Sequence, residues 1–270
     1  MSQEKVHTHD RQPIRGVKDM IAVSSGKGGV GKSTIAANLA LAMAAEGLSI
    51  GLIDTDIYGP NVPGIVGIAG RPSIDPTNNR IKPGKAYGIS VISMGMLIDA
   101  AVPVIWRGPM LAKMIHQFLF QVDWGQIDIM LLDLPPGTGD VQITLTQTAP
   151  LTGAVCITTP SKLAIEDVKR GVEMFRQTDI PLLGLIENMS GFVCNSCGHH
   201  VELFGETSGQ QLAAAFNVDF LGKLPLDPEV RQSADDGTPI VAQKENTDTS
   251  MAFTEIAREL ISRLPPDETK

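Results

Sequence analysis

The apolar positions of the chain form short continuous runs that alternate with longer stretches of helical spacing. A continuous apolar run predicts a strand that is buried on both faces, as in a parallel sheet wrapped by helices. Seven such runs are residues 20–24, 49–54, 89–93, 127–133, 153–158, 182–187 and 220–224. Helices are expected at residues 32–45, 109–121, 141–148, 164–178, 206–216 and 249–263. The alternation predicts an α/β fold, with a mostly parallel central sheet covered by helices on both faces.

The distribution of loop-forming residues predicts a single domain. Residues 59–88 are rich in Pro, Gly and Asn and are expected to form a loop region with little regular structure. The chain has no internal repeat, no low-complexity tract and no convincing linker. We therefore expect one domain at residues 20–264, preceded by a flexible leader at residues 1–19 and followed by a polar tail at residues 265–270.

Composition and charge narrow the class of protein. The 270 residues are 43% hydrophobic and only 4% aromatic, so aliphatic side chains must fill the core. A net charge of −8 argues against a general binder of nucleic acid or anionic membranes. No apolar run reaches membrane-spanning length, and the first nineteen residues lack the apolar centre of a secretory signal. We expect a cytoplasmic protein with neither nucleic acid nor membrane as a partner.

A glycine-rich stretch, GKGGVGKST at residues 26–34, lies between the first predicted strand and the first predicted helix. It matches the P-loop pattern G-x-x-x-x-G-K-[ST], with Gly26, Gly31, Lys32 and Ser33 in the required places. Glycines allow main-chain N–H groups to close around phosphate oxygens, and the helix N-terminus adds partial positive charge. The residues expected to surround the phosphates are Gly26, Lys27, Gly28, Gly29, Val30, Gly31, Lys32, Ser33 and Thr34.

The end of this loop predicts separate contacts for nucleotide and metal. Lys32 is expected to neutralise the β- and γ-phosphates, and Thr34 is placed to contact the α-phosphate. The Ser33 hydroxyl is expected to bind Mg²⁺. A lysine and a serine at the start of a helix are not explained by a simple glycine turn.

The fourth apolar run ends at Asp133 and is followed by LPPGTGD, which predicts a Walker B strand and its switch. Asp133 is expected to hold Mg²⁺ through water. Gly137 has no side chain to keep the γ-phosphate from its backbone N–H. Two prolines and a glycine make this loop stiff, with few hinges. We expect the loop to adopt one of two positions, depending on whether the γ-phosphate is present.

Two further carboxylates follow the second predicted strand, at Asp54 and Asp56. The strand ends of a parallel sheet surround the ligand, so acids there suit the phosphate and metal side of the site. Aspartates also commonly stop strands and start turns, and that structural role remains an alternative for both residues.

The three cysteines include one close pair, Cys194-x-x-Cys197, which fits a metal or redox use in a reducing compartment better than a disulfide scaffold. Cys156 lies inside an apolar run and is expected to be a buried core thiol. Two thiolates supply half of the ligands that a tetrahedral zinc or a [4Fe–4S] centre needs, and a second copy of the chain is the simplest source of the others. A zinc site completed by His199 or His200, and a thioredoxin-like redox pair, remain alternatives.

Lys27, directly after the first glycine, completes the deviant P-loop signature K-G-G-x-G-K-[ST]. The chain thereby resembles the dimeric ATPases that include the nitrogenase iron protein, the Min and Par partitioning ATPases and the Mrp/ApbC iron–sulfur carriers. The DLPPGTGD string, together with SMG at 93–95, WRGP at 106–109 and DWG at 123–125, is similar to the Mrp/ApbC branch over about residues 16–263.

The resemblance implies roles for individual residues. It implies a homodimer that closes around ATP, with Lys27 reaching the nucleotide of the partner. It implies that Asp56 orients the attacking water, that Asp54 helps to hold the magnesium environment and that Asn188 binds adenine. The guanine motif N-K-x-D is absent, which also favours ATP, and residues 225–228 resemble the segment that closes over adenine.

For the cysteine pair, the resemblance implies a [4Fe–4S] cluster bridged between two subunits by Cys194 and Cys197 of each. The expected function is an ATP-hydrolysing carrier that transfers the cluster between scaffold and recipient apoproteins, with ATP, Mg²⁺ and the cluster as cofactors. The alternative is a partitioning or Min-type regulatory ATPase with a zinc-binding or structural C-x-x-C. The C-terminus is not a basic amphipathic helix, which argues against the membrane-bound form.

Overall fold

The strands of the computed structural model belong to one large sheet and one small hairpin. The structure describes residues 11–57, 59–97, 108–161, 164–194, 196–204, 209–243 and 247–266. The large sheet contains β1 (Val17–Ser25), β2 (Ile50–Asp54), β3 (Gly84–Ala86), β4 (Ile89–Ser93), β5 (Ile127–Asp133), β6 (Gly153–Thr158), β7 (Leu182–Asn188) and β10 (Phe220–Leu224). The small hairpin pairs β8 (Phe192–Val193) with β9 (His200–Val201).

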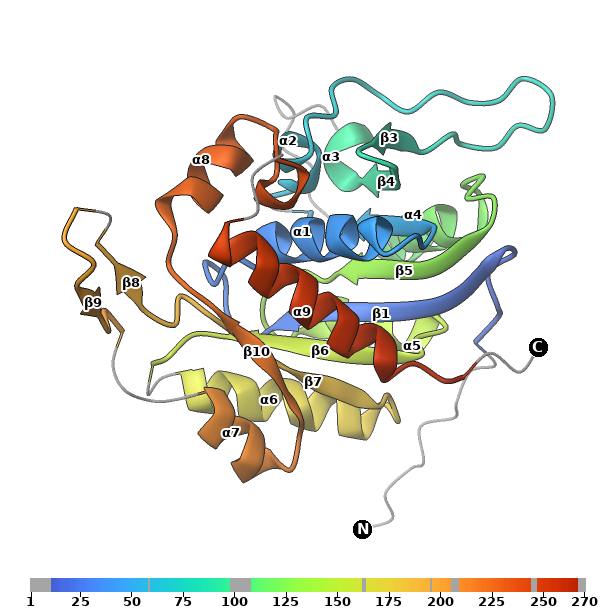
Figure 1. Cartoon of the computed structure of the whole chain (residues 1–270). Helices are drawn as coiled ribbons and strands as arrows, with labels where there is room; N and C mark the ends of the chain where they lie inside the picture. The colour runs from blue at the N-terminus through green and yellow to red at the C-terminus, as the bar shows by residue number, and fades with distance from the viewer. Residues whose placement is uncertain are drawn as a thin grey trace, which may run out of the picture.

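The eight strands of the large sheet run in the order β10-β7-β6-β1-β5-β2-β4-β3 (Figure 1). Only the short edge strand β3 is antiparallel to its neighbour, β4; the other neighbouring pairs are parallel. The seven predicted apolar runs correspond to β1, β2, β4, β5, β6, β7 and β10, which confirms the predicted mostly parallel sheet.

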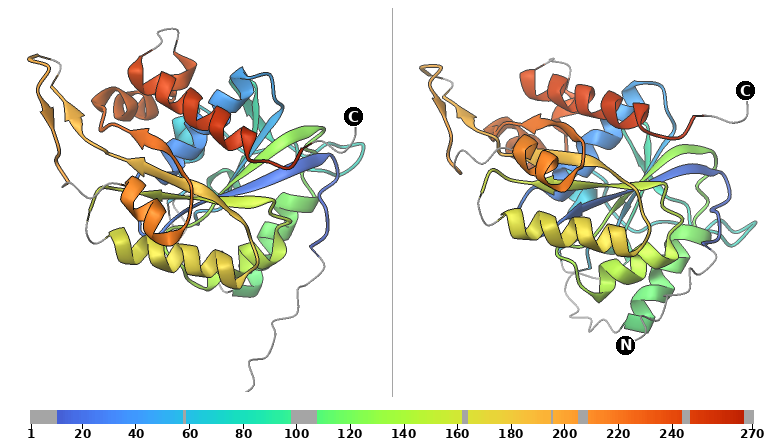
Figure 2. Two further views of the ribbon diagram at one scale, coloured as in Figure 1. Left: turned by 60° about the horizontal axis from the view of Figure 1, so that its bottom comes forward. Right: turned by 90° about the horizontal axis from the view of Figure 1, so that it is seen from below.

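Helices cover both faces of the sheet. They are α1 (Lys32–Ala45), α2 (Val62–Ile65), α3 (Met94–Leu97), α4 (Gly108–Phe120), α5 (Asp140–Thr148), α6 (Ala164–Gln177), α7 (Gly209–Phe216), α8 (Pro228–Asp235), α9 (Asp248–Ser262) and a 3₁₀ turn, η1 (Ile240–Ala242). One core joins the sheet to α1 and α9, and a second core joins its other face to α4, α5, α6 and α7 (Figure 2). None of the helices in the described ranges has the length and apolar character needed to span a bilayer.

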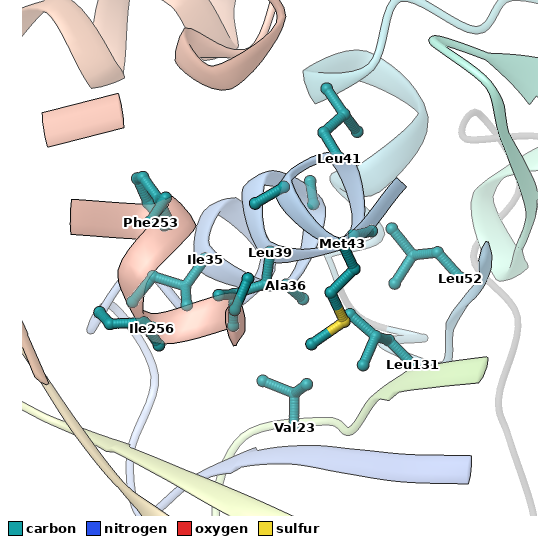
Figure 3. Close-up of a cluster of buried hydrophobic side chains, with 14 of the residues drawn as sticks. Val23, Ile35, Ala36, Leu39, Leu41, Met43, Leu52, Leu131, Phe253 and Ile256 are labelled. Carbon is teal, nitrogen blue, oxygen red and sulfur yellow. The ribbon is translucent and has the colours of Figure 1, made fainter. Parts of the chain in front are cut away.

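The α1 helix is the centre of the first core, which explains its alanine-rich, apolar sequence. It lies between the sheet and α9, so a helix with one polar face would not fit there. Ten of its fourteen residues are buried. Figure 3 shows Ile35 and Leu39 of α1 near Phe253 and Ile256 of α9, with Val23 and Leu131 of the sheet on the other side. This packing fixes the start of α1, which follows the glycine-rich loop.

Strand register brings the carboxyl ends of the central strands to the same edge. Asp133 at the end of β5 is paired with Val23 of β1 on one side and with Asp54 of β2 on the other. The glycine-rich loop, the loop after β2 and the LPPGTGD loop therefore leave the sheet together, as expected for a parallel sheet.

The structure differs from the sequence predictions at the chain ends and in the loops. β1 begins at Val17, and before it Ile14 is buried and the Arg11 side chain donates to the Thr178 carbonyl at 2.7 Å. Residues 11–19 thus pack on the domain, and the prediction of a flexible leader is wrong for this segment. Residues 59–88, predicted as loop, contain α2 and β3, whereas α8 and the β8–β9 hairpin were not predicted. The leader residues 1–10, the tail residues 267–270 and Trp106-Arg107 lie outside the described residues.

Candidate nucleotide and metal site

The glycine-rich loop adopts a conformation that other residues would not tolerate. Gly29 and Gly31 have φ of +80° and +82°, in the left-handed region. A Cβ on Gly31 would lie 2.5 Å from Nδ2 of Asn188, and a Cβ on Gly26 would lie 2.3 Å from Cβ of Asp167. These glycines are therefore required both by backbone geometry and by close packing against β7 and α6.

A cavity of about 640 Å³ opens beside this loop. Its size is within the usual range for small-molecule sites. The P-loop forms one wall, and the end of β7, the loop after β10, α2 and α8 form the others. The lining residues outside the P-loop include Asn61, Gly64, Ile65, Pro136, Asn188, Met189, Pro225, Leu226, Asp227, Val230 and Arg231.

Lys32 and Asp133 form a buried ion pair at the base of this site. Nζ of Lys32 lies 2.5 Å from Oδ1 of Asp133, and the two side chains are 6% and 0% exposed. The Ser33 hydroxyl also hydrogen-bonds the Asp133 carboxylate. Burial raises the pKa of Asp133, while the charge of Lys32 opposes this shift. The predicted phosphate lysine and the two predicted magnesium ligands are thus adjacent.

The second oxygen of Asp133 points to a metal role. Oδ2 is buried and has no hydrogen-bond partner within the described part of the chain. A buried carboxylate oxygen without a donor is unfavourable unless another group pairs with it. A hydroxyl and a free carboxylate oxygen are ligands that Mg²⁺ prefers, so Ser33 and Asp133 fit this ion.

Asp54 organises the loop that follows β2. Its carboxylate accepts hydrogen bonds from the Asp56 and Val62 backbone N–H groups, at 3.1 and 3.2 Å, and from the Ser93 hydroxyl at 2.9 Å. Burial, with the nearby Asp133 charge, raises the pKa of Asp54 to about 7. Because its oxygens already accept from the protein, Asp54 acts on the site by holding this loop, and its magnesium role stays a prediction.

Asp56 is half-buried in the same loop, and its Oδ1 accepts the Gly59 N–H at 3.1 Å. Its charge lies close enough to Asp133 to raise the pKa of that carboxyl group. The structure therefore brings Asp56 near the ion pair, while its role toward water remains a prediction.

Gly137 has φ of +93°, a backbone conformation that favours glycine, although no atom lies within 4 Å of where a Cβ would be. Its N–H, predicted to contact the γ-phosphate, donates to the Ser25 carbonyl at 3.2 Å. A phosphate contact would therefore require this N–H to leave Ser25. Gln142, which sequence reasoning missed, is buried and donates to the Pro135 carbonyl in the same loop.

Asn188 reaches the P-loop from β7. Its Nδ2 donates to the Val30 carbonyl at 2.8 Å, and its side chain lines the cavity. The following residues are fixed to the loop after β10, because Ser190 N–H donates to Leu224 at 3.0 Å and Leu226 N–H donates to Gly191 at 2.7 Å. The predicted adenine contact and the predicted closing segment therefore lie on adjacent walls of the cavity.

The cysteine pair lies in the turn between β8 and β9. Cys194 N–H donates to the His199 carbonyl at 3.0 Å, and Gly198 N–H donates to the Cys194 carbonyl at 2.8 Å. Backbone N–H groups of Ser196 and Cys197 hydrogen-bond the Cys194 sulfur and lower the pKa of its thiol. The turn thus favours the thiolate, which is the form that binds metal.

The remaining candidate ligands do not join this pair. Cys156 is buried in β6, and burial raises the pKa of its thiol to about 12, as expected for a core cysteine. His199 and His200 are exposed, and the His200 ring packs against Gly191. No group of three or more His, Cys, Asp or Glu side chains within the described ranges is placed to hold a metal ion.

The helix α8, which forms one wall of the cavity, was not predicted, although the sequence contains a helix-start pattern for it. Asp227-Pro228 is a helix-start pattern, and the Asp227 carboxylate caps α8 by accepting the Glu229 N–H at 2.9 Å. It also accepts the Thr249 hydroxyl at 2.6 Å, which ties α8 to α9.

Comparison with known proteins assigns nearly the whole chain to one family of P-loop NTPases. Residues 16–261 match the family described as ParA, NUBPL iron-transfer P-loop NTPase. The mouse iron–sulfur cluster transfer protein NUBPL is 45% identical over 256 residues, 94% of this chain and 80% of the relative. An iron–sulfur cluster carrier protein of Aquifex aeolicus is 47% identical over 251 residues, 93% of this chain and 69% of the relative.

Solved structures share the fold. A nucleotide-binding protein from Archaeoglobus fulgidus, solved in complex with ADP and with cobalt, is 35% identical with a TM-score of 0.76, covering 88% of this chain and 93% of that one. The cell-division ATPase MinD of Pyrococcus furiosus is 20% identical with a TM-score of 0.70, covering 90% of this chain and 98% of that one. The second likeness concerns the fold alone.

Proposed function

Because this chain belongs to the ParA family of NUBPL-type iron-transfer P-loop NTPases, we propose that it is an ATP-hydrolysing carrier of iron–sulfur clusters. The observation that supports this most directly is the presence of two sites on one chain. Lys32, which is paired with the buried Asp133, lines a cavity of about 640 Å³, and the thiolate-favouring Cys194 turn begins six residues after Asn188, which lines the same cavity.

Nucleotide binding must first separate the ion pair. Lys32 would exchange the Asp133 carboxylate for the β- and γ-phosphates, which releases Asp133 Oδ1 from the ion pair. Ser33 and Asp133 would then hold Mg²⁺, which, when bound, neutralises charge on the phosphates. The Gly137 N–H would move from Ser25 to the γ-phosphate.

Hydrolysis would use the acid of the loop after β2. Asp56 would orient a water whose oxygen attacks the γ-phosphorus, while the bond to the β–γ bridging oxygen breaks and ADP leaves; the proton of the water passes to a phosphate oxygen and from there to solvent. Lys27 lines the cavity and, in a homodimer, would reach the phosphates of the partner. The resemblance to ATPases with the deviant P-loop implies this division of roles between Lys27 and Lys32.

The cluster is the cargo of this cycle. Cys194 and Cys197 supply two thiolates, so a [4Fe–4S] cluster with four cysteine ligands would take two from each copy of the chain. Such a site binds and releases its cargo when the two copies separate or turn, and it serves scaffold and recipient apoproteins of the cytoplasm. Reduced thiolates are required, which fits a reducing compartment.

The regulatory alternative has weaker support. Likeness to the Min-type ATPase concerns the fold, whereas relatives at 45–47% identity bear cluster carrier or transfer names. We therefore retain the carrier as the proposed function.

The test is anaerobic reconstitution with iron and sulfide, followed by a visible spectrum and by iron and sulfide analysis. The wild-type chain should bind one [4Fe–4S] cluster per dimer. Cys194→Ser or Cys197→Ser should lose it, whereas the matched control Cys156→Ser should keep it. Full cluster content in both C-x-x-C variants, or zinc in place of iron in all of them, would overturn the proposal.

A further inference from the structure

The last two residues of β7 contact different parts of the molecule. Asn188 donates to the Val30 carbonyl of the P-loop at 2.8 Å. Glu187, which is only 5% exposed, accepts a hydrogen bond from the backbone N–H of Gly209, the first residue of α7. Consecutive side chains of a strand point to opposite faces of the sheet, so one peptide bond joins a nucleotide contact to α7.

The chain between these two contacts carries the cysteines. We call its described residues, 189–194 and 196–204, the cysteine arm. The arm leaves the sheet after Asn188, and the β8–β9 hairpin projects from the body of the domain (Figures 1 and 2). A two-stranded hairpin has little stability of its own in water, so the orientation of the arm depends on its attachments.

The arm is held directly on its outgoing side, and the chain is held again where α7 begins. On the outgoing side, the Gly191 carbonyl accepts the Leu226 N–H from the loop after β10, at 2.7 Å. Beyond the returning side, Glu187 accepts the N–H of Gly209, the first residue of α7, five positions after Phe204, the last residue of the arm. The charge of Glu202, just after β9, adds to the effect of burial in raising the pKa of Glu187.

The contact of Glu187 with α7 is sterically specific. A Cβ on Gly209 would lie 2.9 Å from both Cβ and Oε2 of Glu187, so only glycine permits this approach. A carboxylate at a helix N-terminus is favoured, but burial of this one is unfavourable and raises its pKa, with Lys223 opposing that shift. The Glu187 carboxylate is unfavourable to bury, yet it contacts Gly209 closely. This combination points to a role for Glu187 in positioning α7.

From this arrangement we propose that Glu187 is a positioning residue that couples the cysteine arm to the nucleotide pocket. This inference rests on the proposed function in one respect, which is that the arm carries a cluster. The contacts of Glu187 do not depend on that function. When a nucleotide binds beside Asn188, the end of β7 shifts, and Glu187 carries that shift to α7 and the returning side of the arm. The separation of the two C-x-x-C pairs in a dimer then depends on the nucleotide.

The first test needs no cluster. Hydrogen exchange of residues 196–204 is measured by mass spectrometry with and without a non-hydrolysable ATP analogue. In wild type, the analogue should change exchange of the arm by about fivefold or more, the low end of a typical coupling. Glu187→Leu should reduce the change to less than about twofold, whereas Glu187→Gln, which keeps an acceptor for Gly209, should retain most of it.

Two further variants distinguish a loss of coupling between nucleotide and arm from a general loss of folding. Gly209→Ala should weaken coupling as Glu187→Leu does, because its Cβ forces Glu187 away. Asp248→Asn removes an exposed acid from the first turn of α9 and should leave coupling intact, as a control for a general helix-end effect. All four variants should bind the analogue within about threefold of wild type, since Glu187 does not line the cavity.

The second test uses the reconstituted protein. Affinity for the analogue should differ between cluster-loaded and cluster-free wild type, and this difference should disappear in Glu187→Leu. A wild type that binds no cluster sinks the proposed function and leaves the exchange result to decide the role of Glu187. If nucleotide leaves the exchange of the wild-type arm unchanged, or Glu187→Leu keeps the full response, the role assigned to Glu187 is wrong.

Discussion

The buried Lys32–Asp133 pair makes a quantitative prediction about the nucleotide-free protein. Replacing Lys32 by Met removes the positive charge but leaves a carboxylate that is 0% exposed. Breaking a buried ion pair by removing one partner costs about 3–5 kcal/mol, because the remaining charge stays desolvated. We expect the lower end of this range, since the Ser33 hydroxyl still hydrogen-bonds Asp133.

The double variant Lys32→Met/Asp133→Asn should recover much of the loss. Asparagine keeps the shape of the side chain and removes its charge, so a coupling energy of about 2 kcal/mol is expected from the double-mutant cycle. The control is Lys82→Met, which breaks a pair with Asp75 at 2.9 Å in which Lys82 is 51% exposed. That change should cost less than about 1 kcal/mol.

The assay is urea unfolding without nucleotide, followed by circular dichroism. With a slope of about 3 kcal/mol per molar urea, Lys32→Met should lower the midpoint by about 1 M. Both Lys32 variants should also lose nucleotide binding, which calorimetry measures separately. If the costs of Lys32→Met and Asp133→Asn simply add in the double variant, the two side chains are not energetically paired and the reasoning fails.

Three further predictions concern the reaction and its pH dependence. Lys27→Ala should lower the hydrolysis rate with less effect on nucleotide affinity than Lys32→Ala, and equal losses of affinity by calorimetry would contradict the division between own and partner phosphates. Asp56→Asn should bind ATP but hydrolyse it about 10²–10⁴-fold more slowly in a phosphate-release assay, because it keeps the shape and removes the water-orienting carboxylate; a normal rate would remove Asp56 from the mechanism. Burial raises the pKa of Glu187 above 4.5, so this group destabilises the fold as pH rises through its folded-state pKa, and urea unfolding from pH 4.5 to 8 should show Glu187→Gln gaining stability relative to wild type. A stability difference that stays constant over this range would show that Glu187 does not titrate as the structure implies.

Local sequence determined the main elements of the fold and most of the predicted phosphate site. The P-loop residues act through backbone conformation and through the start of one helix, so nine consecutive residues contain the information needed to predict them. The seven long strands were predicted because a strand buried on both faces is continuously apolar. The Cys194 pair was predicted because two thiols at this spacing reach one metal centre.

Short or exposed elements could not be predicted in this way. The β8 and β9 strands have two residues each and no periodic pattern, and their existence depends on the turn between them. The segment before β1 looked like a polar leader, yet Ile14 is buried and Arg11 reaches the carbonyl of Thr178, 167 positions away. Tertiary contacts decided whether these segments are ordered.

Only the tertiary structure decided how the site residues are paired. Asn188 and Val30 are 158 positions apart, and Lys32 and Asp133 are 101 apart. Such pairs are set by strand register and by the packing of α1 between the sheet and α9, which no local pattern encodes. The sequence therefore determined which groups could bind phosphate, magnesium and metal, because those are properties of single residues and short spacings. The structure decided that Lys32 pairs with Asp133, that the Gly137 N–H donates to Ser25 and that Glu187 accepts the N–H of Gly209, because distance in a folded chain depends on all of its packing.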